Sequence, residues 1–114
     1  MKLSQIVKKC QLEKIVFSVD EEISSGYSGD LMSDVMANAR ANSIWITIQA
    51  HKNSIAVALI KDIKAILFTN NVSIGQEVVE KAKEEDIILL RTKKDSFTVS
   101  GEIYSMMEDK TAKD

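Results

Sequence analysis

Short runs of β-branched and aromatic residues alternate with segments of helical periodicity along this chain, and this alternation limits the fold more than any other feature. The apolar runs are short, as expected for strands that are covered on both faces. The predicted strands are residues 14–19, 43–50, 64–70 and 87–92, and the predicted helices are residues 3–10, 30–39, 51–62, 73–86 and 96–107. This order predicts a three-layer α/β/α domain with four or five mostly parallel strands and helices on both faces.

Composition excludes several classes of protein. The chain has 114 residues, which predicts a single domain over 1–114 with a tail, EDKTAKD, that frays. The net charge is −2 and no basic stripe occurs, so nucleic acid is not an expected partner. No apolar run approaches the roughly 20 residues that span a bilayer, and the first residues lack the apolar core of a secretory signal. We therefore expect a cytoplasmic protein without membrane contact.

The residue counts also argue against metal and disulfide chemistry. The chain has one cysteine, Cys10, and one histidine, His51. A single cysteine forms no internal disulfide, and this pair is too few for the usual zinc sites. Cys10 lies on the apolar face of the first predicted helix, and Trp45 lies within a predicted strand, so both are expected in the core. We expect no metal and no cofactor.

Helix starts are predicted from capping residues. Asp30 is expected to cap the second helix, and Asn53 or Ser54 the third. Ser73, followed three residues later by Gln76, has the pattern of a capping box for the fourth helix. The fifth helix has a possible interruption near Gly101.

The stretch GYSGD, residues 26–30, is the first candidate site. A glycine-rich turn between a strand and a helix can bind an anion through backbone N–H groups at the helix N-terminus. The spacing, however, matches neither a dinucleotide fingerprint nor a P-loop, and a capping Asp30 would compete with phosphate for the same N–H groups. The stretch is thus either a ligand loop or a capped turn from strand to helix.

The stretch TIQAHKN, residues 47–53, is the second candidate. Thr47, Gln49, His51 and Asn53 alternate, so at the end of a strand their side chains would share a face. Open α/β sheets bind ligands at the carboxyl ends of their strands. His51 titrates near neutral pH and could act as a base, but no acidic partner is recognisable beside it. A binding role shared with Thr47 and Asn53 is the alternative, as is a plain surface histidine.

Three blocks together resemble the DRTGG domain family in its short stand-alone form. They are GYSGDLMSDVMANA, SIWITIQAHKNSIAVALIKDIKAILFTNN and EKAKEEDIILLRTKKDSFTVSGEIY, and the resemblance extends from Lys14 to Tyr104. The motif that names the family would fall near Phe68-Thr69-Asn70-Asn71, where only the threonine is kept. Asn70 and Asn71 can adopt the left-handed conformation that glycine permits, so the turn itself is compatible with asparagine.

The resemblance implies a fold like the N-terminal domain of HPr serine kinase/phosphorylase, a regulatory role, and a homodimer. Stand-alone relatives occur near iron hydrogenase genes in anaerobic bacteria. No enzymatic activity is implied for the module, and a kinase activity does not transfer, because that kinase uses a separate P-loop domain that this chain lacks.

Three hypotheses follow. The first is a non-enzymatic regulatory or sensory homodimer that binds a small anionic or nucleotide-like ligand. Its ligand-binding residues would be Ser28, Gly29, Asp30, Thr47, Gln49, His51 and Asn53. The second is a dimeric adaptor for a hydrogenase or other redox complex, with an exposed apolar patch and no small ligand. The third is an enzyme that uses His51 and an adjacent acid.

Overall fold

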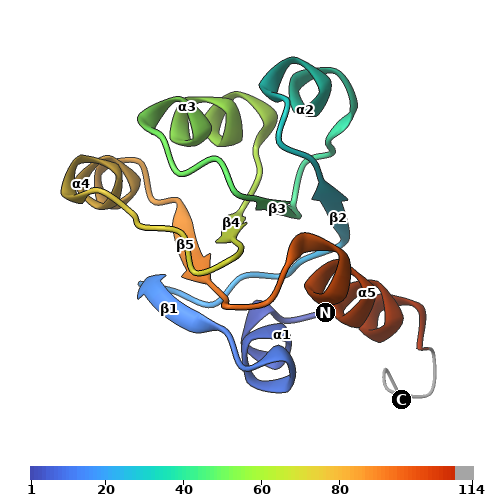
Figure 1. Cartoon of the computed structure of the whole chain (residues 1–114). Coiled ribbons are helices and arrows are strands. Elements are labelled where there is room, and N and C mark those ends of the chain that lie inside the picture. The colour runs from blue at the N-terminus through green and yellow to red at the C-terminus, as the bar shows by residue number, and fades with distance from the viewer. Residues whose placement is uncertain (110–114) are drawn as a thin grey trace.

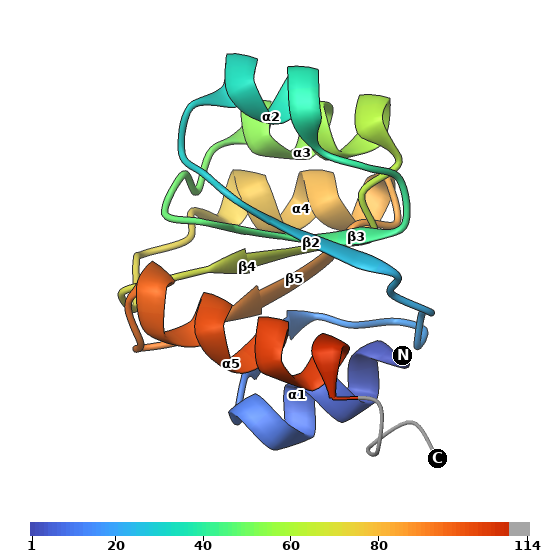
Figure 2. The ribbon, with the colours of Figure 1, turned by 90° about the vertical axis from the view of Figure 1, so that its right-hand side faces the viewer.

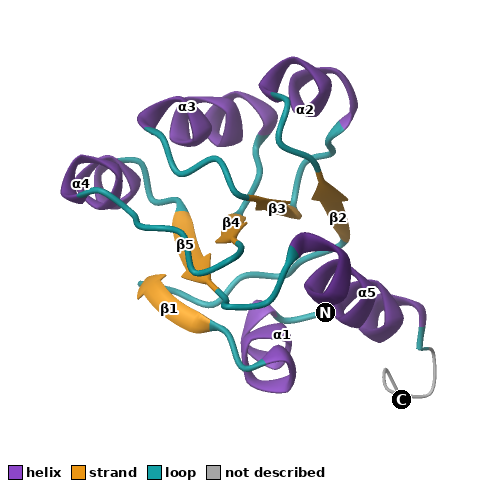
Figure 3. Cartoon of the chain, in the orientation of Figure 1, coloured by secondary structure: helices purple, strands orange, loops and turns teal. Residues whose placement is uncertain are grey.

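The computed structural model describes residues 1–109 as five helices and five strands (Figures 1 and 3). The elements in chain order are α1 (Leu3–Cys10), β1 (Glu13–Val16), β2 (Ser25–Ser28), α2 (Met32–Asn38), β3 (Ser43–Thr47), α3 (Lys52–Lys61), β4 (Ala65–Phe68), α4 (Gln76–Glu84), β5 (Ile88–Arg91) and α5 (Ser96–Glu108). Of the tail that was expected to fray, residues 110–114 lie outside the described part of the chain.

The strands form one sheet in the order β1-β5-β4-β3-β2. The four strands β2 to β5 are parallel to their neighbours, and β1 pairs antiparallel with β5. The predicted α/β fold with a mostly parallel sheet is therefore confirmed. Because the chain passes from β2 through β3 and β4 to β5 by way of helices, each parallel neighbour is also the next strand in sequence.

Helices cover both faces of this sheet, which gives the three predicted layers (Figure 2). Helices α2, α3 and α4 lie on one face, where Trp45, Ile66 and Leu89 are buried beneath them. Helices α1 and α5 lie on the other face and pack against Ile44 and Leu67. Along each strand, these residues alternate with the residues that face α2, α3 and α4. The strands lack alternation of polar and apolar residues because both of their faces are buried.

Two strand predictions need correction. The strand expected at residues 14–19 covers only Glu13–Val16, and it is antiparallel, with an irregular register between Lys14 and Val16. The stretch SGYS, expected to be part of a loop, is the edge strand β2. The stretch has no apolar run, which is the usual sequence signal of a strand. Its residues are small and polar because an edge strand buries little side-chain surface.

Several predicted helix caps are also wrong. Helix α3 begins after His51 rather than at Asn53 or Ser54, and α4 begins after Gly75, so Ser73 and Gln76 form no capping box. Helix α5 passes through Gly101 without a break, and the side chain of Asp95 caps it by accepting from the N–H of Thr98 at 2.8 Å. Cys10 and Trp45 are buried, as predicted.

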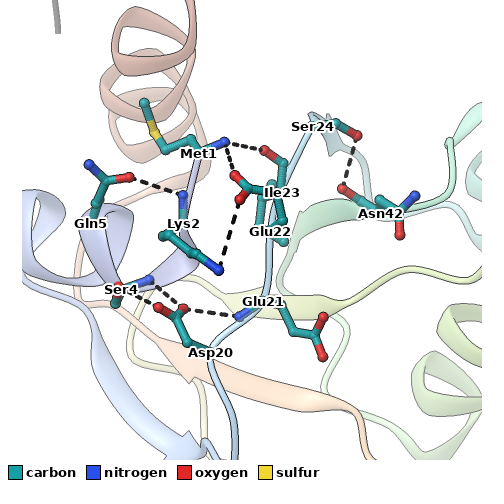
Figure 4. A network of polar contacts seen from close by, with 10 residues as sticks. All are labelled: Met1, Lys2, Ser4, Gln5, Asp20, Glu21, Glu22, Ile23, Ser24 and Asn42. Carbon is teal, nitrogen blue, oxygen red and sulfur yellow. Dashed lines mark hydrogen bonds and ion pairs between the residues drawn. The ribbon is translucent and has the colours of Figure 1, made fainter. Parts of the chain in front are cut away.

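A polar network ties α1 to the segment that leads into β2 (Figure 4). Asp20 accepts hydrogen bonds from the N–H of Ser4 at 3.0 Å, from Ser4 Oγ at 2.7 Å and from the N–H of Glu21 at 3.0 Å. The N-terminal amine contacts Glu22 at 2.5 Å and donates to the carbonyl of Ile23 at 3.2 Å. Asp20 thus satisfies a free N–H in the first turn of α1 from a distant part of the chain.

The Asp20 network predicts a pH-dependent part of the stability. The hydroxyl of Ser4 and the nearby backbone N–H groups hold the pKa of Asp20 below its ordinary value. A carboxylate with a depressed folded-state pKa stabilises the fold above its unfolded-state pKa, and this contribution is lost as the pH falls through the folded-state pKa. We expect Asp20→Asn to lower the unfolding free energy at neutral pH by about 1 kcal/mol, as for a lost helix cap, and to have little effect in strong acid.

Urea unfolding followed by far-UV circular dichroism between neutral and strongly acidic pH tests this. Glu21→Gln is the matched control, because no hydrogen bond to the Glu21 carboxylate occurs within residues 1–109. Equal deficits for Asp20→Asn at neutral and acidic pH would contradict the assignment.

Candidate functional site

The two candidate stretches lie at the same edge of the sheet. Strand β2 pairs in parallel with β3, from Ser25 opposite Ser43 to Ser28 opposite Ile46. Parallel neighbours end at the same side, so the segments that follow β2 and β3 meet there. The N–H of Gly29 continues the pairing by donating to the carbonyl of Ile46 at 3.1 Å. Neither Gly26 nor Gly29 has a positive φ, so this stretch does not depend on the conformational freedom of glycine.

Asp30 joins the two segments directly. Its Oδ1 accepts from Thr47 Oγ1 at 2.8 Å and from the N–H of Ile48 at 3.0 Å. Thr47 Oγ1 in turn accepts from the N–H of Gln49 at 3.1 Å, while its side chain is buried. The expectation that Asp30 caps α2 is therefore wrong: Leu31 occupies the cap position without a side-chain hydrogen bond, and the carboxylate binds the end of β3 instead.

Two aromatic side chains support the segment after β2. Trp45, which is fully buried, donates from Nε1 to the carbonyl of Gly29 at 2.8 Å. Tyr27 donates from its hydroxyl to Asp34 Oδ2 at 2.5 Å, and this carboxylate raises the pKa of the phenol. Sequence reasoning placed Trp45 in the core but missed its polar contact, since an indole N–H in a strand does not reveal its acceptor.

The remaining candidates do not share a strand face. Strand β3 ends at Thr47, so the alternation expected for residues 47–53 does not continue. Gln49 lies in the connection, His51 precedes the first residue of α3, and Asn53 lies within its first turn. The connection is closed by a hydrogen bond from Ser54 Oγ to the carbonyl of Gln49.

His51 and Asn53 are exposed at this edge. Within residues 1–109, neither side chain makes a hydrogen bond or ion pair, and no acid lies within hydrogen-bond reach of His51. The arrangement that an enzyme using His51 requires is therefore not found in the described part of the chain. Both side chains are free to contact a ligand.

Two cavities lie between α5 and the edge of the sheet that includes β2. One has a volume of about 750 Å³, and the other, about 570 Å³, adjoins it. Of the seven candidate residues, Ser28 is the one that lines either cavity. The sequence signal for this region is Gly101, a glycine within a predicted helix, where the structure shows an unbroken helix instead of an interruption.

Among residues 1–109, no three histidine, cysteine or carboxylate side chains are grouped closely enough to hold a metal ion. None of the helices described is both long and apolar enough to cross a bilayer.

Comparison with known sequences decides the family. The sequence model of the DRTGG domain matches residues 28–106. The chain belongs to the DRTGG domain family. No curated protein matches this member of the family in sequence.

A solved structure has the same fold as this DRTGG protein. It contains the CBS and DRTGG domains of the regulatory region of Clostridium perfringens pyrophosphatase, complexed with its activator, diadenosine tetraphosphate. The TM-score is 0.66 at 18% sequence identity, over 87% of this chain. The match covers 44% of the clostridial chain, so this chain spans less than half of that regulatory region.

Asn70 and Asn71 form a turn after β4. Asn70 and Asn71 both have left-handed backbone conformations, with φ of 57° and 51°. Their N–H groups donate to the carbonyls of Lys94 at 2.9 Å and Thr92 at 2.8 Å. Asparagine tolerates positive φ better than most residues, which explains how these two residues form the turn without glycine.

Proposed function

We propose that this DRTGG protein is a regulatory module that binds a small anionic or nucleotide-like ligand without catalysing a reaction. One observation carries the proposal. The segments after β2 and β3 are joined through Asp30, Thr47 and the N–H of Ile48, and the segment after β3 leads to His51 and Asn53, which are exposed and have no partner among residues 1–109. The nucleotide activator of the clostridial regulatory region supports the class of ligand.

Some residues of the proposed site stabilise its structure, and others contact the ligand. Asp30 and Thr47 hold the two segments in register, and Gly29 and Gln49 contribute backbone to the same edge. His51 and Asn53 offer donors and acceptors to the ligand. Ser28 ends β2 and lies opposite Ile46 of the neighbouring β3. Carboxyl ends of parallel strands are where open α/β sheets bind their ligands.

Thermal denaturation of the purified protein with ATP, AMP, diadenosine tetraphosphate and inorganic phosphate tests the function. A ligand that binds only the folded state adds about 2.7 kcal/mol at one hundred times its Kd. We expect a saturable rise in Tm that is smaller in His51→Ala and in Asn53→Ala than in the wild type, because these side chains contact the ligand. Both variants should keep the unliganded Tm, since their side chains are exposed.

Lys8→Ala, on an exposed position of α1, is the control and should keep the full shift. Wild-type shifts in both site variants would contradict the proposed residues. No shift with any of these compounds would contradict the ligand class.

We further infer that two copies associate through β2. The two edge strands of the sheet, β1 and β2, differ in the charge of their side chains. The outer strand β1 has Glu13 and Lys14 and an irregular register, features that discourage pairing with another chain. Strand β2, SGYS, carries no formal charge at its edge. Pairing of β2 with its copy would extend the sheet across a homodimer.

An adaptor of a redox complex, such as a hydrogenase, is the second candidate. It is favoured by Phe97 and Tyr104 of α5, which are 90% and 67% exposed. Large exposed apolar side chains on one helix are typical of protein contact surfaces. This function predicts that no nucleotide or phosphate changes the Tm.

A further inference from the structure

A groove runs between α5 and the edge of the sheet formed by β2 and β3. Helix α5 lies beside β2 in both views of the ribbon (Figures 1 and 2). The groove has a volume of about 750 Å³, within the range of sites for small organic molecules. Its lining includes Gly26, Ser28, Phe97, Ser100, Gly101 and Tyr104.

No contact within residues 1–109 requires glycine at two positions of the groove, Gly26 and Gly101. A Cβ added to Gly101 would meet no atom within 4 Å, although glycine inside a helix costs about 1 kcal/mol relative to alanine. A Cβ on Gly26 would lie 3.6 Å from Ile44 Cγ2, an ordinary contact. Neither glycine has a positive φ. Both absent side chains leave space in the groove, one from the helix and one from the strand.

The hydroxyl groups beside the groove are occupied by partners within the chain. Ser100 Oγ shares a hydrogen bond with Ser28 Oγ. Thr98 Oγ1 donates to Asp95 at 3.2 Å, and Ser96 Oγ lies 3.2 Å from Thr69 Oγ1. The groove therefore presents mainly apolar surface despite its serines and threonines, and it suits a flat ring better than a fully polar ligand.

Aromatic side chains flank this surface along the helix. Phe97 and Tyr104 are seven residues apart, which places them about two turns from each other on the same side of α5. Both are exposed, and both line the groove. A base placed over Gly101 could stack on either ring, an interaction that every nucleobase can make.

The cavity that adjoins the groove is lined by charged side chains. It has a volume of about 570 Å³ and shares Gly26, Tyr104 and Met107 with the groove. It is lined by Arg40, whose guanidinium makes no ion pair within residues 1–109, and by the carboxylate of Glu108. A free guanidinium matches the geometry of a phosphate, and a carboxylate can accept from sugar hydroxyls.

We propose that the groove is a nucleotide-binding site, with the base against Phe97, Gly101 and Tyr104 and the phosphate toward Arg40. The class of ligand rests on the proposed function, but the location does not. The groove contains neither His51 nor Asn53, and Ser28 is the residue that it has in common with the edge site. It places ligand binding on the last helix, which the strand-end rule would not predict.

The probe for the groove is 1-anilinonaphthalene-8-sulfonate, an aromatic anion that fluoresces on apolar surface. We expect saturable binding to the wild-type protein and competitive displacement by AMP or ATP. Gly101→Leu should weaken probe binding at least tenfold because its side chain fills the groove. Phe97→Ala should weaken binding as well, and the 90% exposure of Phe97 means that its removal leaves the fold intact.

Ser105→Leu is the matched control, because Ser105 is exposed on the same helix but outside the groove. It should bind the probe like the wild type. Gly101→Ala should raise the Tm by a few degrees, since it adds helix propensity without a clash. Unchanged probe affinity in both Gly101→Leu and Phe97→Ala would overturn the site, as would the absence of saturable binding to the wild type.

The groove and the proposed function fail in different ways. If nucleotides raise the Tm of the wild type and of Gly101→Leu equally, the function stands and the groove assignment is wrong. If the variants lose the probe but no nucleotide displaces it or shifts the Tm, the nucleotide assignment and the ligand class both fail. If sedimentation velocity shows a wild-type dimer that Gly101→Leu dissociates, the groove is an interface between copies rather than a nucleotide site.

Discussion

Trp45→Ala is expected to destabilise the protein by about 3–5 kcal/mol, a large part of the 5–15 kcal/mol that stabilises a typical domain. The indole is fully buried in the interior strand β3, between β4 and β2, among the residues that α2 and α3 cover. Truncation leaves a cavity and removes the donor to the carbonyl of Gly29. Urea unfolding followed by far-UV circular dichroism measures the loss, because the variant has no tryptophan left for fluorescence.

Trp45→Phe separates packing from the hydrogen bond. It retains most of the apolar ring and loses the N–H, so we expect a loss of about 1–3 kcal/mol, smaller than that of Trp45→Ala. Equal losses in the two variants would mean that the contact to Gly29, rather than burial of the ring, dominates. A loss below 1 kcal/mol in Trp45→Ala would contradict the burial of this side chain in the core.

The contact between Asp30 and Thr47 is expected to show strong coupling. Asp30→Ala should cost about 2 kcal/mol, because it leaves the hydroxyl of the buried Thr47 and the N–H of Ile48 without their acceptor. Once Thr47 is replaced by valine, the loss of Asp30 should cost less, since one of its two donors is already gone. We expect an interaction energy of about 1 kcal/mol from the double-mutant cycle.

The control for this cycle is Asp30→Asn, which keeps an oxygen acceptor and should retain part of the stability. Additive effects of Asp30→Ala and Thr47→Val would show that the two side chains do not depend on each other. The result bears on function, because this contact holds the segments that carry Gly29 and Gln49 at one edge.

The sequence by itself determined the class of the fold. Three strands, around Trp45, Leu67 and Leu89, are continuous apolar runs because both of their faces are buried. Helix α4, between the last two of them, has a clear apolar face that buries Val78 and Ala82. These signals are local, so they can be recognised without knowing how the helices and strands are arranged in space. The resemblance to the DRTGG family was likewise carried by contiguous blocks, and the match over residues 28–106 confirms it.

Tertiary structure decided what depends on partners distant in the chain. Strand β2 buries too little to be read from SGYS, and it forms because β3 offers it a parallel edge. Asp30 has the sequence pattern of a helix cap, yet it binds Thr47 because pairing of β2 with β3 brings that hydroxyl within 2.8 Å. The groove beside α5 exists because the last helix packs beside an edge strand from the first third of the chain. The sequence shows that Gly101 has no side chain within a helix. Only the packing of α5 beside the sheet shows that this position lines a groove.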